Sequence, residues 1–141
     1  LAGCGIALIF LPHFGRSFIH GATFYDGSKI VVGLTVRGKD ADRFWFSLFH
    51  ELGHIILGHL TNDCTDEGIE DEADEFSKNI LIAKDDYSSF VAKGVFNRSS
   101  IRAFARLIGI DPGIVVGRLQ KDGYLNFSAF NDMKTHYEIT A

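Results

Sequence analysis

Five residues near the middle of the chain, His50-Glu51-Leu52-Gly53-His54, have the types and spacing needed for metal-assisted hydrolysis. Two histidines four residues apart on a helix project from nearly the same face, so both imidazoles can bind one metal ion. Glu51 lies one step round the helix from His50, close enough to touch a metal-bound water without being a ligand. The pattern predicts a zinc-activated hydrolase with His50 and His54 as ligands and Glu51 as general base.

A catalytic zinc site usually has three protein ligands and one open position, so a neighbouring element should supply the third ligand. Glu70 and Asp74 lie four residues apart on one face of a second expected helix, beside an apolar stripe that would pack against the first. We assign Glu70 as the third ligand and Asp74 as an acceptor that fixes the tautomer of a ligating histidine. Asp71 and Glu67 stay open as alternatives, because the acidic run over 63–75 is also typical of a solvated helix face.

The other histidines and the cysteine near the motif are weaker ligand candidates. His59 is five residues from His54, and the longer zinc pattern HExxHxxGxxH needs a glycine and a histidine where this chain has two leucines. We therefore interpret His59 as a residue at the C-terminal end of the helix. Cys64 is a lone thiol in an expected loop and is interpreted as a bystander. His13 and His20 are expected to lie on the surface or to be hydrogen-bonded in the core, and not to face the metal site.

The composition limits the class of protein. With 141 residues, 46% of them hydrophobic, the chain is long enough for one globular domain with a buried core. A net charge of −4 argues against a protein that mainly binds nucleic-acid phosphates, and two isolated cysteines suit the cytoplasm. No apolar run reaches the ~20 residues that would cross a bilayer. Residues 1–12 lack the features of a signal peptide, and the initial leucine suggests that further residues precede it.

Strand signals occupy the N-terminal part and helical signals the rest. The apolar run 5–11 predicts a buried strand, 17–25 a weaker strand and 29–36 a β-branched strand, the last two forming a hairpin around the turn 26–28. Strand 29–36 of this hairpin is expected to lie beside the catalytic helix. If its edge is exposed there, an extended substrate could bind to it by strand addition. Tyr25 and Tyr87 are weak candidates for contacts to the oxyanion.

A first helix is expected from Asp40 or Asp42 to about His59, and a second over 66–82. Their apolar stripes are Phe44, Leu48, Leu52 and Ile56 in the first, and Ile69, Ala73, Phe76 and Ile80 in the second. Shorter helices are expected at 84–93, 99–108 and 112–121. The fold class is α+β: one domain, 1–141, with a small N-terminal antiparallel sheet (1–38), the zinc-site helices (39–83) and a C-terminal helical part (84–141).

The motifs resemble those of the ImmA/IrrE family of bacterial and phage metallo-endopeptidases. The resemblance rests on the run HELGHIILGHL, the preceding RFWFSLF and the downstream pattern ExxADxF formed by Glu70, Ala73, Asp74 and Phe76. The late segment SSIRAFARLIGIDPGIVVGRLQKDG is similar to the tail of members fused to an N-terminal helix-turn-helix domain, often described as antitoxin-like or XRE-type regulators. The chain departs from the family pattern in two ways. It has Ser77 where relatives often have alanine, and it shows no helix-turn-helix domain ahead of the sheet.

The resemblance implies a cytoplasmic zinc peptidase that cleaves a DNA-binding repressor, releasing stress-response or mobile-element genes. It carries the ligand roles over to His50, His54 and Glu70, and the role of base to Glu51. Zinc is the expected metal, although His/His/carboxylate sites also take manganese or iron.

Two other functions compete with peptidase activity. The arginines of segment 98–121 suggest a DNA-binding module, but its would-be recognition helix reads PGIVVGRLQ and is apolar where base-reading side chains should project. Packing against the peptidase core explains this segment better. The second alternative is a metal-dependent sensor whose peptidase site is silent.

Overall fold

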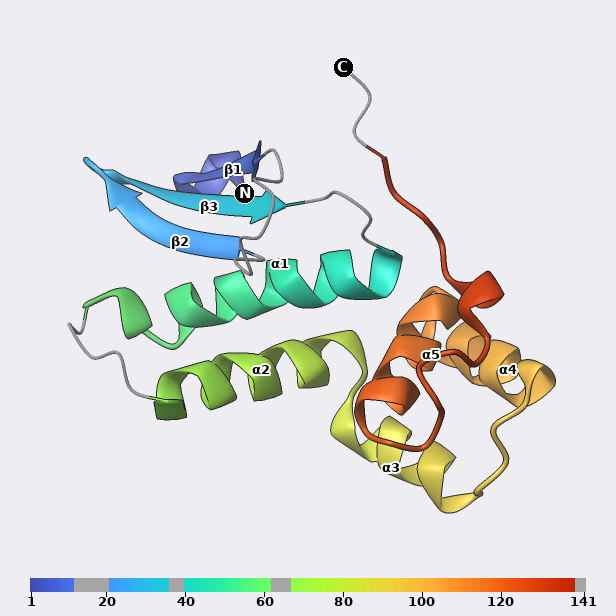
Figure 1. Ribbon diagram of the computed structural model, residues 1–141. Helices are drawn as coiled ribbons and strands as arrows, with labels where there is room; N and C mark the ends of the chain where they lie inside the picture. Colours follow the sequence, from blue (N-terminus) through green and yellow to red (C-terminus); the bar gives the residue numbers. More distant parts are fainter. Residues whose placement is uncertain (12–20, 36–39, 62–66, 139–141) are drawn as a thin grey trace. The chain divides into compact units, whose positions relative to one another are not determined.

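The computed structural model describes residues 1–11, 21–35, 40–61 and 67–138, which form a three-stranded sheet and five α-helices (Figure 1). The predicted α+β class is confirmed. The chain divides into two compact units: unit 1 contains Leu1–Arg37, Phe46–Ser77 and Glu138–Ala141, and unit 2 contains Gly38–Trp45 and Lys78–Tyr137. That the two make up one domain stays a prediction. No helix of the described ranges is long and apolar enough to cross a membrane.

The sheet of unit 1 consists of β1 (Ile6–Leu11), β2 (Gly21–Asp26) and β3 (Lys29–Thr35) in the order β1-β3-β2. β2 and β3 pair antiparallel across a two-residue turn in which Gly27 has a positive φ of 61°, a conformation that glycine adopts without strain. The predicted hairpin is therefore confirmed. The part of the weaker strand expected over 17–20 lies outside the described residues.

The direction of β1 corrects the prediction of an antiparallel sheet. β1 pairs parallel with β3, from Ile6 opposite Ile30 to Leu11 opposite Thr35, so the sheet is mixed. The hairpin turn fixes only β2 against β3; nothing local to 5–11 encodes the direction in which β1 joins the other side of β3. The expected free edge at 29–36 is also wrong, because β3 is the central strand and is buried along Val31–Thr35. Among the strands that the structure describes, β1 and β2 lie at the edges.

Unit 1 contains most of α1 (Ala41–Ile56) and of α2 (Glu67–Leu81). Within this unit α1 lies between the sheet and α2, and the two helices run in opposite directions (Figure 1). They approach most closely at two small residues. A Cβ atom on Gly53 would lie 3.0 Å from Cδ1 of Phe76 and 3.4 Å from Cα of Ala73, which is completely buried. Buried Ser77 donates a hydrogen bond of 2.8 Å to the carbonyl oxygen of Phe46, so this departure from the family pattern links α2 to α1.

The first helix is shorter than predicted. α1 ends at Ile56 instead of His59, because Gly58 adopts a left-handed conformation (φ 76°) and a 3-10 turn, His59–Thr61, follows. Both apolar stripes also end in exposed residues, Ile56 and Ile80, whereas Leu48 and Ala73 nearer their centres are buried.

Unit 2 contains α3 (Lys84–Ala92), α4 (Arg98–Ile108), α5 (Pro112–Lys121) and a 3-10 turn, Asn131–Met133. The expected breaks are confirmed, since Gly94 and Gly109 both have positive φ. Two side chains cap the helices that follow these breaks. Asn97 forms a capping box with Ser100 at the start of α4, and Asp111 accepts a hydrogen bond from the Gly113 amide at the start of α5.

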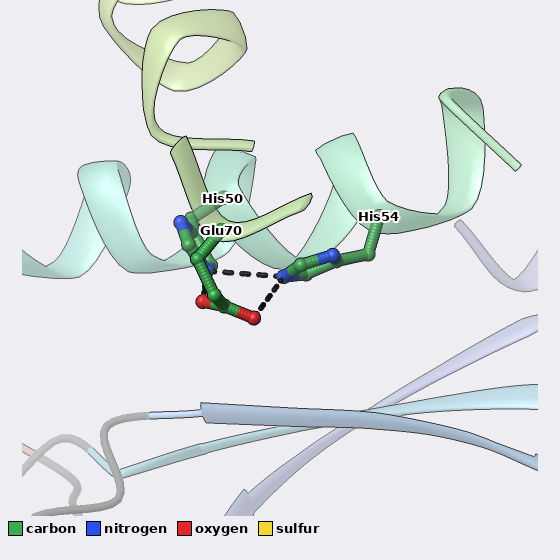
Figure 2. A group of neighbouring side chains, drawn as sticks. All are labelled: His50, His54 and Glu70. Carbon is green, nitrogen blue, oxygen red and sulfur yellow. Dashed lines mark hydrogen bonds and ion pairs between the residues drawn. The ribbon is translucent and has the colours of Figure 1, made fainter. Parts of the chain in front are cut away.

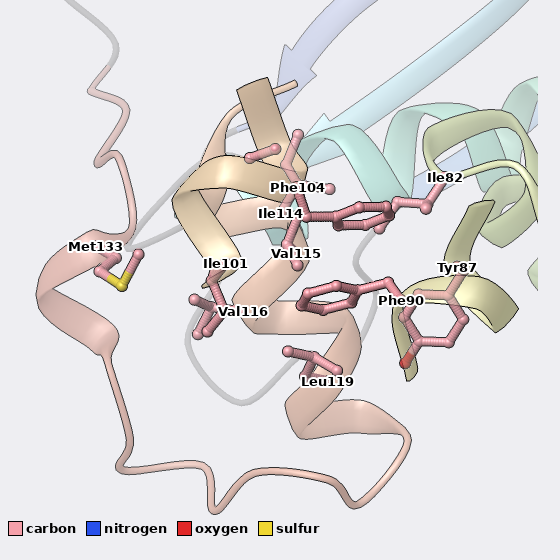
Figure 3. Packing of buried hydrophobic residues seen from close by; sticks show 11 residues of the cluster. Ile82, Tyr87, Phe90, Ile101, Phe104, Ile114, Val115, Val116, Leu119 and Met133 are labelled. Carbon is pink, nitrogen blue, oxygen red and sulfur yellow. The ribbon is translucent and has the colours of Figure 1, made fainter. Parts of the chain in front are cut away.

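The core of unit 2 is built around α5 (Figure 3). This helix contributes Ile114, Val115, Val116 and Leu119, and the rings of Phe90 and Phe104 stack with centroids 4.3 Å apart. The apolar residues of 112–121 thus pack within unit 2; that this segment packs against the peptidase core instead of binding DNA stays a prediction. Its apolar residues are used to stabilise unit 2.

Replacing Leu119 by alanine tests this core. Leu119 is completely buried in α5, so we expect Leu119→Ala to lower the free energy of unfolding by about 2–5 kcal/mol. Leu107→Ala is the control, because Leu107 in α4 is 82% exposed and should change stability by less than about 0.5 kcal/mol. Urea unfolding of both variants measures the difference; equal losses would contradict the assigned core.

Candidate metal centre

The structure brings together the three residues predicted to bind a metal, His50 and His54 from α1 and Glu70 from α2 (Figure 2). Nε2 of His50 lies 3.1 Å from Nε2 of His54 and 3.1 Å from Oε2 of Glu70. Nε2 of His54 lies 3.4 Å from Oε1 of the same carboxylate. The two imidazoles thus contact different oxygens of the Glu70 carboxylate, and one ligand atom from each of the three side chains lies within 4.8 Å of the others.

These separations fit a shared cation. Two donors bound at ~2.0–2.1 Å to one tetrahedral ion lie about 3.3 Å apart. The two Nε2 atoms are 3.1 Å apart, and each lies 3.1 or 3.4 Å from one oxygen of Glu70. Two imidazole nitrogens and a carboxylate oxygen are also the donor set that zinc, manganese and iron accept. The chemistry and the spacing of the residues therefore fit the metal that the motif implies.

Asp74 contacts the other side of the His50 ring. Its Oδ1 lies 2.7 Å from Nδ1 of His50, so His50 contacts Glu70 through one ring nitrogen and Asp74 through the other. A carboxylate in this position accepts a hydrogen bond from Nδ1–H, so the proton stays on Nδ1 and Nε2 keeps a free lone pair. This is the contact expected for Asp74 from the sequence.

Glu51 is directed toward the sheet and is only 7% exposed. The hydroxyl of Thr23 in β2 donates a short hydrogen bond to its Oε2. Its Oε1 lies against Gly21, where a Cβ atom would be only 2.7 Å away. The candidate base is therefore held by two residues of an edge strand.

Burial is the main influence on the titration of His54. It lowers the pKa of His54 below its ordinary value, because the charged imidazolium loses hydration, and nearby His50 acts in the same direction. The charges of Glu70 and Glu51 act against this effect and raise the pKa. The net result favours the neutral ring, which is the form that binds a metal.

His59 and Glu72 were not predicted to have a role in the site. Nδ1 of His59 lies 3.0 Å from Nδ1 of His54, and its Nε2 lies 3.0 Å from Oε2 of Glu72. On a continuous helix His59 would point well away from His54. The left-handed turn at Gly58 brings it back, and a glycine two residues beyond the end of the helix was the available signal.

The remaining candidates lie apart from these contacts or outside the described residues. Asp71 is exposed and is not in the group formed by His50, His54 and Glu70. Tyr87 is buried in unit 2, where its hydroxyl donates to Asp122 over 2.8 Å; this contact and burial raise its pKa. Outside the described side chains are Glu67, Cys64, His13 and His20.

Comparison with known families agrees with this site. Residues 14–108 match the family Peptidase_M78, described as the IrrE N-terminal-like domain, and this range includes every residue of the candidate metal centre. The chain therefore carries a metallopeptidase-type domain. It belongs to the IrrE N-terminal-like family, as the resemblance of its motifs indicated. No curated protein is significantly similar to the chain.

Removing the Glu70 carboxylate tests the ligand set. We expect Glu70→Ala to weaken Zn²⁺ affinity by more than the ~10–100-fold typical of losing a residue behind a ligand. Asp71→Ala is the matched control, since it removes the same charge from the neighbouring exposed position and should leave affinity nearly unchanged. Competition with a coloured chelator measures both; full zinc content in Glu70→Ala would show that Glu70 is not a ligand.

Proposed function

We propose that this chain is a zinc-dependent endopeptidase that cleaves a DNA-binding repressor protein in the cytoplasm. His50, His54 and Glu70 bind the metal, Glu51 is the general base, and Asp74 orients His50. The observation that carries the proposal is the convergence of His50 and His54 of α1 with Glu70 of α2: one ligand atom from each lies within 4.8 Å of the others. Glu51 lies on the same helix as the two histidines.

The family supports the peptidase part of this proposal, because its members are of metallopeptidase type. The repressor substrate and the stress or mobile-element circuit come from the resemblance to ImmA/IrrE proteins. A substrate of this kind is a folded DNA-binding protein with an exposed segment that can enter the site in an extended form.

The bound cation would supply a Lewis acid and lower the pKa of a water molecule toward ~7. Glu51 takes the proton from the attacking water and passes it to the leaving amine. Thr23 occupies Oε2 of Glu51, so Oε1 is the oxygen assigned to proton transfer. The Glu51 side chain itself occupies the space where a side chain of residue 21 would lie.

The substrate is assigned to the edge of β2. Among the described strands, β2 pairs on one side only, with β3, and it carries the two residues that contact Glu51. An extended peptide that adds to β2 through main-chain hydrogen bonds would pass beside the base. This assignment replaces the edge expected at 29–36.

The decisive experiment is incubation of the zinc-loaded chain with the repressor encoded beside its gene, with and without a chelator. We expect discrete fragments that disappear when the chelator is added. If the chain binds zinc but cleaves nothing, the metal-dependent sensor becomes the better reading of the same site.

Replacing the base separates metal binding from chemistry. We expect Glu51→Gln to keep Zn²⁺ affinity and to lower the cleavage rate by about 10²–10⁴-fold, because the amide cannot accept the proton. Zinc titration and single-turnover cleavage measure the two quantities. Cleavage at the wild-type rate would remove Glu51 from the mechanism.

Gly21→Ala tests whether the position of Glu51 matters, because it displaces the Glu51 side chain without changing its chemistry. The new Cβ of Gly21→Ala would lie 2.7 Å from Oε1 of Glu51, and this flexible side chain must move away. We expect a fall in kcat of ~10-fold or more, since small misplacements of a catalytic group are costly, with zinc affinity unchanged. The matched control is Gly27→Ala in the β2–β3 turn, where a Cβ meets nothing within 4 Å, although its positive φ costs some stability.

A further inference from the structure

His54 and His50 each contact Glu70 through Nε2, and each has a second partner at Nδ1. For His50 that partner is the Asp74 carboxylate. For His54 it is another imidazole, Nδ1 of His59 at 3.0 Å, and Nε2 of His59 in turn lies 3.0 Å from Oε2 of Glu72. The His59 side chain is only 8% exposed, so its ring is held among protein atoms.

Only one arrangement of protons satisfies all these contacts when Nε2 of His54 binds a cation. A neutral imidazole carries one N–H, so His54 must carry its proton on Nδ1. That proton needs an acceptor, which requires Nδ1 of His59 to be unprotonated. The proton of His59 is then on Nε2, where it faces the Glu72 carboxylate.

We propose that His59 and Glu72 are positioning residues that fix His54 as the Nδ1–H tautomer, with the Nε2 lone pair directed at the metal. The inference rests on the proposed function and deepens it. His59 would thus fix the tautomer of His54 as Asp74 fixes the tautomer of His50. His59 acts through His54 and does not touch the metal or the substrate.

The alternative role for His59 is packing alone. A packing role needs the volume of the ring but neither of its nitrogens. The structure instead places both nitrogens at hydrogen-bond distance from polar atoms, in an order that ends on a carboxylate. The two roles therefore predict different results for substitutions that keep the volume and for those that keep the hydrogen bonds.

The first test measures Zn²⁺ affinity and the unfolding free energy of the metal-free protein for two substitutions of His59. His59→Phe keeps a ring but removes both nitrogens, so we expect affinity to fall by about 10–100-fold. His59→Gln offers an amide oxygen to His54 and an amide N–H to Glu72, so its affinity should recover toward the wild-type value. If His59→Phe binds zinc as tightly as the wild type, the proposal is overturned.

Glu72→Ala tests whether the carboxylate that contacts His59 contributes to zinc binding, with Asp71→Ala as the matched control. We expect weaker zinc binding than in Asp71→Ala, which removes the same charge from the adjacent position of α2. The loss should be smaller than for His59→Phe, because the Glu72 side chain is 67% exposed and water can replace its carboxylate. Identical zinc affinities for Glu72→Ala and Asp71→Ala would show that Glu72 does not help to position His59 and His54.

The second test reads the tautomers directly by long-range ¹H–¹⁵N correlation NMR of the zinc-loaded wild-type protein. We expect a protonated Nδ1 on His54, and on His59 an unprotonated Nδ1 with a protonated Nε2. A protonated Nδ1 on His59 would overturn the proposal. Failure of the wild-type chain to bind zinc would instead refute the proposed function, so the two failures are distinct.

Discussion

The close packing of α1 against α2 at Gly53 and Ala73 is the constraint on which the site depends. Gly53 lies between the two histidines of the motif, and Ala73 lies between Glu70 and Asp74. A side chain on Gly53 would meet Phe76 and the backbone of Ala73, so its absence lets the helices approach. The contact that packs the helices is therefore the one that brings Glu70 to the paired imidazoles. Metal-site geometry and helix packing cannot vary independently here.

The sheet contributes to the site in a different way. The helices supply all the candidate ligands, whereas β2 supplies the two residues that hold Glu51. The candidate base and the candidate ligands are thus positioned by separate elements of unit 1. This division explains why a change in β2 can displace the base while leaving the donor atoms where they are. It also puts the base beside the edge strand that the substrate is proposed to join.

Local patterns in the sequence identified the parts of the site that lie within one helix or one hairpin. The spacing of His50 and His54 depends only on helical geometry, and the β2–β3 turn is encoded by its own residues. The parallel direction of β1, the contact of Thr23 with Glu51 and the return of His59 toward His54 depend on residues distant in sequence or on a single backbone conformation. Periodicity carries no information about such contacts: His59 is not in the group of possible ligands, as expected, but the left-handed turn at Gly58 brings it beside His54.

The three candidate ligands are held to different degrees. The side chains of His50 and His54 are 16% and 12% exposed, and each has a partner on its Nδ1, whereas Glu70 is 67% exposed. The rings are pre-organised, so little conformational entropy is lost when they bind a cation, and the flexible carboxylate accounts for most of the ordering cost, up to about 2 kcal/mol. Exchange of the metal should therefore proceed on the side of Glu70, where one mobile ligand separates the ion from solvent.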